Sequence, residues 1–269
     1  MLAWLSPLVL VVMVTAAITI KLLVRRCAPL GGWFTDSSRS AGTLSVIGTM
    51  VAVVLAFVIL FALQSYKQAR DGASVEAIAV AELHSVAGVF PAPSSDRLQG
   101  GLVCYARAVI ENEWPAMREG RSSELVQSWI DNQGREFANT EPQGARQENA
   151  HAQWFDEEAR RREGRRERLA ESTPFVSLPL WSMLGLGASL TIAYMCAQAD
   201  RREGVLIQSI PIGFVTALVT AGLLLIVALD HPYADWSGNI VPTEMRRTLA
   251  LIDHGSAAPC DERGIPGST

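Results

Sequence analysis

Four long apolar segments constrain the fold of this chain more than any other feature. They cover roughly residues 2–24, 43–63, 175–197 and 205–229, and they are almost free of charged side chains. A helix needs about 20 apolar residues to cross a hydrocarbon core of about 30 Å. Backbone amides inside a bilayer must be satisfied within the chain, so helices cross it and open strands do not. The sequence therefore predicts an all-α multi-pass membrane protein with four transmembrane helices.

A strongly charged stretch separates the second apolar segment from the third. Its apolar residues recur at three- and four-residue spacing, which is typical of amphipathic helices. We therefore expect a helical soluble insert between the second and third transmembrane helices. The predicted organisation is a first helix with its connection (1–42), a second helix (43–66), the insert (67–173), the third and fourth helices (174–230) and a polar tail with a disordered end (231–269).

The second apolar segment, TLSVIGTMVAVVLAFVILFAL, is followed by QSYKQAR with no Gly or Pro break at the junction. We expect one helix to continue from the membrane into the insert. Such a helix joins the two parts mechanically, which suits a conduit or a sensor better than a simple anchor. Further along, Trp114-Pro115 is expected to end the second helix of the insert, because the residue before a proline avoids the α region.

Small residues form a stripe on this second transmembrane helix. Gly48, Ala52 and Ala56 recur at four-residue spacing, so they share one helix face. In lipid, small residues let helices approach closely, because association there depends on packing. We interpret the stripe as a helix–helix contact.

Phe57, Phe61 and Gln64 follow at four- and three-residue spacing near the other end of the same helix. Apolar rings can gate a pore by dewetting, so these residues are candidates for a hydrophobic constriction with a polar mouth. Ordinary contact with lipid or with the protein core is the alternative. The spacing alone leaves both interpretations open.

Four glutamates on consecutive predicted helices of the insert can converge: Glu76, Glu82, Glu111 and Glu113. Paired helical carboxylates can bind metals, but such sites usually add a Glu-x-x-His element, which this sequence lacks. We therefore expect solvated carboxylates or salt bridges to arginine, and no metal or cofactor. The sequence also contains no nucleophile elbow, P-loop or dinucleotide fingerprint, so we predict no enzyme and no catalytic residue.

Six arginines lie within residues 160–168, just ahead of the third apolar segment. Among them, Arg165, Arg166 and Arg168 are candidates for attracting anions or lipid headgroups. A basic cluster beside a membrane attracts anionic headgroups, at about 1 kcal/mol per residue. It can equally form a positive vestibule that concentrates anions at a pore mouth, or simply set the topology.

The four cysteines show no CxxC spacing and no nearby His pair, so a zinc site is not expected. If four helices cross the membrane, Cys27 and Cys196 lie near one face, and Cys104 and Cys260 lie on the other. A Cys104–Cys260 disulfide requires that the second face is oxidising. Four unpaired thiols are the preferred interpretation.

Several separated motifs resemble the bacterial bestrophin-like family over roughly residues 43–252. The firmest are EWPAM at Glu113–Met117 and ALDHPY at Ala228–Tyr233, in which His231 stands where an arginine is often found. The resemblance implies a four-helix subunit in a bacterial inner membrane, with a helical domain between helices two and three. Bestrophins are pentameric anion channels whose second helix lines the pore, so the resemblance implies that Phe57, Phe61 and Gln64 are pore-lining. The acidic cluster that binds calcium in bestrophins is not evident after Asp230, so calcium gating is not implied.

A physical argument supports assembly independently. Four helices packed at about 8–10 Å leave no lumen within one subunit, so any pore must lie between subunits around a symmetry axis. The predicted function is an oligomeric, anion-conducting channel whose partners are its own copies, membrane lipids and inorganic ions, with no nucleic acid. The alternative is a non-conducting membrane sensor or scaffold whose insert binds a partner.

The sequence gives conflicting signals on membrane orientation. The short connections carry six basic residues on one face, which argues that those connections are cytoplasmic. They are Lys21, Arg25, Arg26, Arg39, Arg201 and Arg202. The arginines of residues 160–168 argue the reverse, as does the comparison with bestrophins. Long loops follow the rule poorly, so the arginines count for less, and the comparison with bestrophins leads us to prefer a cytoplasmic insert.

Overall fold

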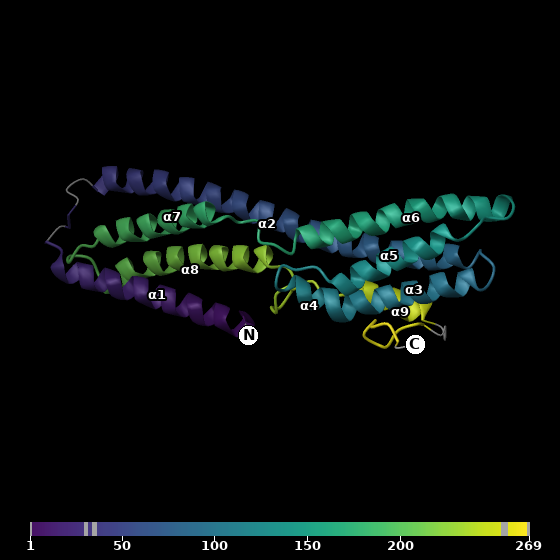
Figure 1. The fold of residues 1–269 in the computed structure, drawn as a ribbon. Helices are drawn as coiled ribbons and strands as arrows, with labels where there is room; N and C mark the ends of the chain where they lie inside the picture. The colour runs from purple at the N-terminus through teal and green to yellow at the C-terminus, as the bar shows by residue number, and fades with distance from the viewer. Residues whose placement is uncertain (1, 30–31, 34–36, 254–257, 268–269) are drawn as a thin grey trace. The chain divides into compact units, whose positions relative to one another are not determined.

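The computed structural model describes residues 2–29, 32–33, 37–253 and 258–267, and every regular element in these ranges is helical (Figure 1). The elements are α1 (Leu2–Cys27), α2 (Ser37–Ala87), α3 (Ser94–Ala108), the π-helical η1 (Val109–Glu113), α4 (Trp114–Met117), α5 (Glu124–Ala138), α6 (Ala145–Ala170), α7 (Leu178–Ala197), α8 (Val205–Asp230) and α9 (Thr243–Ile252). The chain divides into two compact units. Unit 1 takes Met1–Gln64, Pro174–Asp230 and Asp235–Ser237, and unit 2 takes Ser65–Thr173, His231–Ala234 and Gly238–Thr269.

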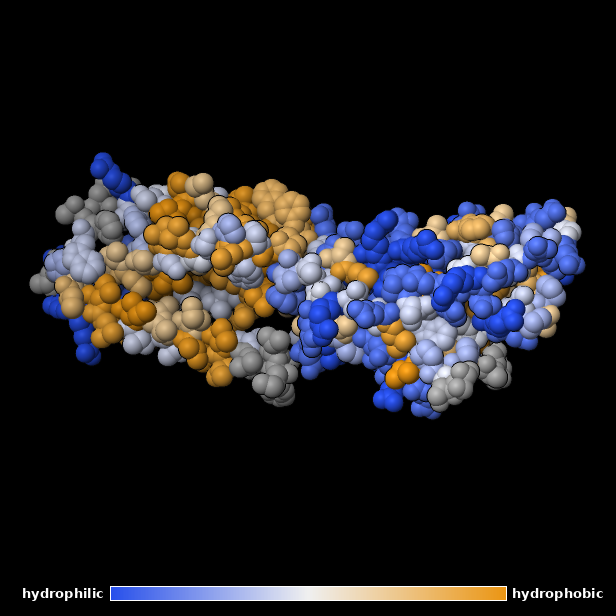
Figure 2. All heavy atoms as spheres, in the orientation of Figure 1, coloured by the Kyte–Doolittle hydropathy of each residue, from blue (hydrophilic) through white to orange (hydrophobic). Residues whose placement is uncertain are grey.

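Unit 1 holds α1, the first part of α2, α7 and α8. Within the described chain, 4 helices are long and apolar enough to cross a membrane. Figure 2 shows hydrophobic residues over most of the visible surface of these helices, whereas the visible surface of unit 2 is mostly hydrophilic. The prediction of four membrane-spanning helices is confirmed, and the protein is a multi-pass membrane protein.

Glycines let the helices of unit 1 approach α2 closely. A Cβ atom at Gly222 of α8 would lie 2.8 Å from a methyl group of Leu55, and one at Gly187 of α7 would lie 3.1 Å from Val51. At the end of α8, the buried carboxylate of Asp230 accepts hydrogen bonds from the backbone N–H groups that precede α7, at 2.9 and 3.2 Å. Unit 1 is therefore held by tight helix packing and by one polar contact at a helix end.

Helix α2 is continuous over 51 residues, from Ser37 to Ala87. It contains no proline, and at about 1.5 Å per residue it is more than twice as long as a bilayer core is thick. Its first part belongs to unit 1 and its second part to unit 2. The expectation that the apolar segment continues as one helix into the polar region is confirmed.

Unit 2 has one apolar core built from amphipathic helices. The second part of α2 contributes Leu83, α3 contributes Leu98 and Leu102, α5 contributes Trp129, and α9 contributes Met245. All five side chains are buried. The apolar periodicity that predicted helices in this region is therefore matched by a buried core, although Val75 and Ile78 on α2 are exposed.

The predicted helix end at Trp114-Pro115 is wrong, because the helical path continues through η1 into α4 and ends at Met117. The N–H of Trp114 donates to the carbonyl of Val109 across the π-helical turn. Pro115 then occupies the first turn of α4, where a residue without an N–H group is tolerated.

Within the polar tail, residues 258–267 belong to unit 2, whereas residues 254–257 and 268–269 of the predicted disordered end lie outside the described residues. Cys260 forms a disulfide with the buried Cys104 of α3. The preferred interpretation of four unpaired thiols is therefore wrong for this pair, and only Cys27 and Cys196 are free. The local sequence around each cysteine could not reveal the pairing, because the two residues are 156 positions apart.

Candidate functional site

The predicted pore-lining residues lie on an exposed face of α2 in unit 1. Phe57 is 56% exposed and Phe61 is 53% exposed, and Gln64 is exposed as well. The opposite side of the helix packs within the chain, since Val58 is 5% exposed and Ala62 is fully buried. The Phe57, Phe61 and Gln64 side chains are thus available to lipid, water or another copy of the chain.

The small-residue stripe is not what packs α2 against its own chain. A Cβ atom at Gly48 would meet nothing within 4 Å among the described residues, and Ala52 and Ala56 are exposed. The close approaches to α7 and α8 come instead from Val51 and Leu55, on another side of the helix. A contact through Gly48, Ala52 and Ala56 therefore requires a partner outside this chain.

In unit 2, α2 and α6 cross with their backbones in contact. A Cβ atom at Gly164 would lie 2.6 Å from the backbone nitrogen of Glu76, and one at Gly72 would lie 2.8 Å from the carbonyl oxygen of Gly164. Only glycine fits at such an approach. One helical turn beyond each glycine stand Glu76 and Arg168, so the crossing brings these two side chains together.

Arg168 is the centre of a buried ion-pair cluster. Its guanidinium donates to both carboxylate oxygens of Glu76, at 2.5 and 2.8 Å, and to Glu113 at 2.6 Å. All three side chains are fully buried. The guanidinium also lies over the ring of Trp114, 5.0 Å from its centroid. A buried charge held in this way is stable only while its partners are present.

Arg165 completes the charge balance. It donates to Glu113 at 2.6 Å and to the side-chain oxygen of Gln127 at 2.9 Å. Two arginines therefore face two glutamates, Glu76 and Glu113. The N–H of Ser123 also donates to Glu113, at 3.3 Å.

The electrostatics of the cluster follow from this pairing. Burial alone would raise the pKa of Glu113, but the guanidinium groups of Arg168 and Arg165 outweigh it and hold the pKa below its ordinary value. Burial alone would lower the pKa of Arg168, but Glu76 and Glu113 outweigh it and raise that pKa well above its usual range. Both groups are therefore charged at neutral pH.

Two tyrosines extend the cluster. The hydroxyl of Tyr105 donates to Glu76 at 2.6 Å, and burial together with the Glu76 charge raises the pKa of Tyr105 well above its ordinary value. The hydroxyl of Tyr233 donates to the backbone carbonyl of Arg168 at 3.0 Å. Burial likewise raises the pKa of Tyr233. Both hydroxyls are thus fixed, neutral donors.

The structure corrects the expectation that Arg168 attracts anions or lipid headgroups, because its guanidinium is fully buried and already bound by two carboxylates. Arg165 and Arg166 remain candidates, since they line a surface pocket of about 590 Å³ together with Arg162. The Arg166 side chain is 77% exposed and lies 3.8 Å from Glu163.

The predicted salt bridges to arginine are confirmed for two of the four glutamates, Glu76 and Glu113. Glu82 and Glu111 are exposed and lie outside the cluster. The sequence did not indicate which glutamate meets which arginine, because the partners are 92 and 55 positions apart. The signal for this pairing in the sequence was the two glycines at the helix crossing, Gly72 and Gly164.

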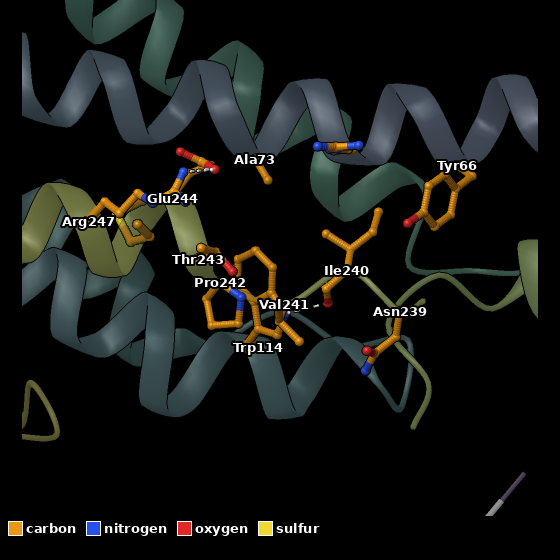
Figure 3. A pocket seen from close by; sticks show the side chains of 12 residues that line it. Tyr66, Ala73, Trp114, Asn239, Ile240, Val241, Pro242, Thr243, Glu244 and Arg247 are labelled. Atoms are coloured by element: carbon orange, nitrogen blue, oxygen red, sulfur yellow. Dashed lines mark hydrogen bonds and ion pairs between the residues drawn. The ribbon is translucent and has the colours of Figure 1, made fainter. Parts of the chain in front are cut away.

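A pocket of about 330 Å³ lies beside this cluster in unit 2 (Figure 3). Tyr66 and Ala73 line it from α2, Trp114 from α4, and residues 239–245 and 247 from α9 and the segment before it. The indole N–H of Trp114 donates to the carbonyl of Ile240 at 3.1 Å, and the hydroxyl of Tyr66 donates to the carbonyl of Gly238 at 2.8 Å. These bonds fix the segment after α8 within unit 2.

Comparison with known proteins identifies the relatives of this architecture. A model of the bestrophin-like domain matches residues 12–236. None of the curated proteins compared with the chain matches it. Three crystal structures of a bacterial bestrophin homologue from Klebsiella pneumoniae, each carrying a mutation, are similar in fold.

The first has a TM-score of 0.68 at 12% identity and covers 91% of this chain and 99% of its own. The second has a TM-score of 0.70 at 12% identity, over 90% and 98% of the two chains. The third has a TM-score of 0.67 at 13% identity, over 90% and 96%. At this identity the structures show a shared fold, and the domain match shows the family: the chain belongs to the bestrophin-like family.

Proposed function

We propose that this protein is an oligomeric bestrophin-like ion channel that conducts anions, with α2 lining a pore on the symmetry axis. The observation that carries the proposal is the exposed aromatic face of α2, Phe57 and Phe61, with Gln64 one turn further on. The same helix packs through its other side into unit 1. A face of this kind in a ring of copies forms an apolar constriction with a polar mouth.

The small-residue stripe supports assembly. A Cβ atom at Gly48 would meet no described residue of its own chain, Ala52 and Ala56 are exposed, and all three lie on a different side of α2 from Phe57. Copies that approach through this stripe would turn their aromatic faces toward a common axis. We propose a homo-oligomer, with five subunits as in bestrophins, surrounded by lipids of a bacterial inner membrane.

Unit 2 lies outside the bilayer in this proposal, as the soluble insert. Its polar surface and its internally paired charges suit an aqueous compartment. In unit 2, the exposed Arg166 beside Arg162 is the group that we propose attracts anions, because Arg165 is already held by Glu113. Conduction through a channel is passive transport of ions down their electrochemical gradient, and it requires no bound cofactor.

Single-channel recording tests the proposal. Purified protein in a planar bilayer is expected to pass current, and a chloride gradient is expected to move the reversal potential toward the chloride equilibrium potential. The oligomer mass is measured on the same preparation in detergent. Intact oligomers that give a flat trace under salt gradients and voltage steps would indicate the non-conducting sensor or scaffold instead.

Phe57→Ala separates a constriction from simple packing. We expect the variant to change single-channel conductance severalfold while the oligomer stays intact, because the side chain is exposed within its own chain. Phe214→Ala on α8 is the matched control, since Phe214 is 73% exposed and is not on α2. Equal conductance changes in the two variants, or loss of the oligomer in Phe57→Ala, would remove Phe57 from the pore.

A further inference from the structure

We infer that unit 2 lies on the oxidising, periplasmic side of the membrane, the reverse of the cytoplasmic placement that we preferred from the sequence. The inference concerns insertion alone and holds whether or not the protein conducts. It rests on three observations: a disulfide within unit 2, the positions of the free thiols and basic residues in unit 1, and the place of the arginines of α6 inside a long insert.

The first observation is the Cys104–Cys260 disulfide in unit 2. Cys104 is fully buried in the core of that unit and Cys260 is partly buried against it, so the pair is a structural link within the fold. Structural disulfides persist in oxidising compartments such as the periplasm, whereas the cytoplasm keeps thiols reduced. A domain held in this way belongs outside the cytoplasm.

Hydrogen bonds from side chains of unit 2 hold the segment around Cys260 in place. Arg107 of α3 donates to the carbonyls of Cys260 and Asp261 at 3.4 and 3.3 Å and pairs with Asp253 at 2.8 Å. The indole N–H of Trp129 donates to the carbonyl of Gly264 at 2.8 Å. These contacts fix the C-terminal segment on unit 2 independently of the disulfide.

Gly264 allows the C-terminal segment to pack closely against α3. Its φ is +75°, and a Cβ atom there would lie 2.6 Å from the backbone nitrogen of Ala108, four residues after Cys104. The side-chain amide of Asn112 also donates to the carbonyl of Arg263, at 2.7 Å. The sequence of the segment is therefore adapted to bring Cys260 beside Cys104, so the pairing is not an accident of proximity.

The second observation is that the two free cysteines lie in unit 1, at helix ends on the other side of the membrane. Cys27 is the last residue of α1, and Cys196 is next to the last residue of α7. With four crossings, the ends of α1 and α7 reach the same membrane face, opposite the insert. Thiols are thus paired on one side and free on the other, as expected for a reducing cytoplasm.

The basic residues of the short connections lie on that same face. Arg25, at the end of α1, donates to the backbone carbonyls of Asp200 and Glu203 at 3.2 and 2.6 Å. Arg201 in turn donates to the carbonyl of Arg25 at 3.2 Å. The connections are therefore neighbours, and their excess of Lys and Arg marks them as cytoplasmic.

The third observation removes the opposing signal. Each arginine of residues 160–168 has a carboxylate partner in unit 2, and the insert is too long for its charges to direct insertion. The pairs are Arg160–Glu157 at 3.0 Å, Arg161–Glu158 at 2.6 Å, Arg162–Glu158 at 2.7 Å, Arg165–Glu113 at 2.6 Å, Arg166–Glu163 at 3.8 Å and Arg168–Glu76 at 2.5 Å. Because long domains cross the membrane largely regardless of their charge, these arginines do not argue for a cytoplasmic insert.

Labelling of single cysteines in intact cells tests the inference. In a full-length chain with Cys27→Ser and Cys196→Ser, we introduce Glu141→Cys, between α5 and α6, or Arg202→Cys, between α7 and α8. Both positions are exposed. A membrane-impermeant maleimide is expected to label Glu141→Cys in intact cells, and Arg202→Cys only after the cells are broken.

The opposite pattern, with Glu141→Cys unlabelled until the cells are broken, would overturn the inference. A second readout is the state of the native pair. In acid-quenched cells Cys104 and Cys260 are expected to resist alkylation until a reductant is added, and alkylation without reductant would also count against the inference. Neither measurement depends on current, so failure here leaves the channel proposal standing, and absence of current leaves this inference standing.

Discussion

The two units of this chain use glycine and charge in opposite ways. In unit 1, glycines bring helices against aliphatic side chains, as Gly222 does with Leu55, and large apolar faces stay exposed for lipid. In unit 2, Gly72 and Gly164 bring two backbones together so that fully buried charges can meet. The first unit is stabilised by packing without a hydrophobic effect between its helices, and the second by a satisfied charged core.

This difference predicts where each unit is vulnerable. A buried ion pair contributes little net stability when complete, yet removing one partner is costly because the other charge stays buried. Packing between membrane helices is spread over many contacts, and single exposed positions contribute little to the fold of the subunit. We therefore expect single substitutions in unit 2 to lower its stability strongly. Single substitutions at exposed positions of unit 1 are expected to change mainly the assembly of the oligomer.

The largest expected effect is that of Arg168→Met. Two glutamates, Glu76 and Glu113, would keep buried charges without their central partner. We expect a loss of about 3–5 kcal/mol in the free energy of unfolding, measured by chemical denaturation in detergent and followed by tryptophan fluorescence.

Arg166→Met is the matched control for that variant. Its side chain is 77% exposed and its pairing distance is 3.8 Å, so we expect a change of at most about 1 kcal/mol. Similar losses in the two variants would mean that the buried cluster is not what stabilises unit 2.

Gly164→Ala is expected to have the next largest effect. Its new methyl group would lie 2.6 Å from the backbone nitrogen of Glu76, so α6 must move away from α2. The expected cost is about 1–3 kcal/mol, measured in the same denaturation assay. Gly134→Ala in α5 has open space around it and is expected to be neutral or to stabilise by up to about 1 kcal/mol. If both variants were neutral, the helices could not be in backbone contact.

Local patterns in the sequence were sufficient for the elements of both units. The apolar segments predicted the four membrane helices, and the unbroken junction after Leu63 predicted that α2 continues. Within the EWPAM motif, Glu113 and Trp114 proved to contact Arg168, so the residues that carried the family resemblance are those of the buried cluster.

Long-range pairing was not available from the same patterns. Periodicity identifies a buried face, but it does not say which distant residue that face meets. Glu76 and Arg168 meet only because two glycines remove the side chains between their helices, and Cys104 meets Cys260 only because the C-terminal segment folds back. The same limit applies to the exposed face of α2, because contacts within a single chain do not show what that face meets.

The pH dependence of unit 2 sharpens the comparison further. Because the folded pKa of Glu113 lies below its ordinary value of 4.5, its stabilising contribution is complete above about pH 4.5 and is lost as the pH falls from there through the folded pKa. We expect the thermal midpoint of unit 2 to fall in that acidic window and to vary less with pH in Glu113→Gln. A midpoint that falls equally in both proteins would assign the acid sensitivity to other groups.

The smallest effect on folding is expected for Gly48→Leu, and it tests whether unit 1 responds through assembly. A Cβ atom at this position would meet no described atom outside its own stretch of helix within 4 Å, so we expect the free energy of unfolding to change by no more than about 0.5 kcal/mol. The bulky side chain would block close approach of a second copy, and the oligomer mass by light scattering should fall. Gly222→Leu is the contrasting control, because it would collide with Leu55 at 2.8 Å and disturb the subunit itself. An unchanged oligomer in Gly48→Leu would mean that the stripe faces lipid and that another surface joins the copies.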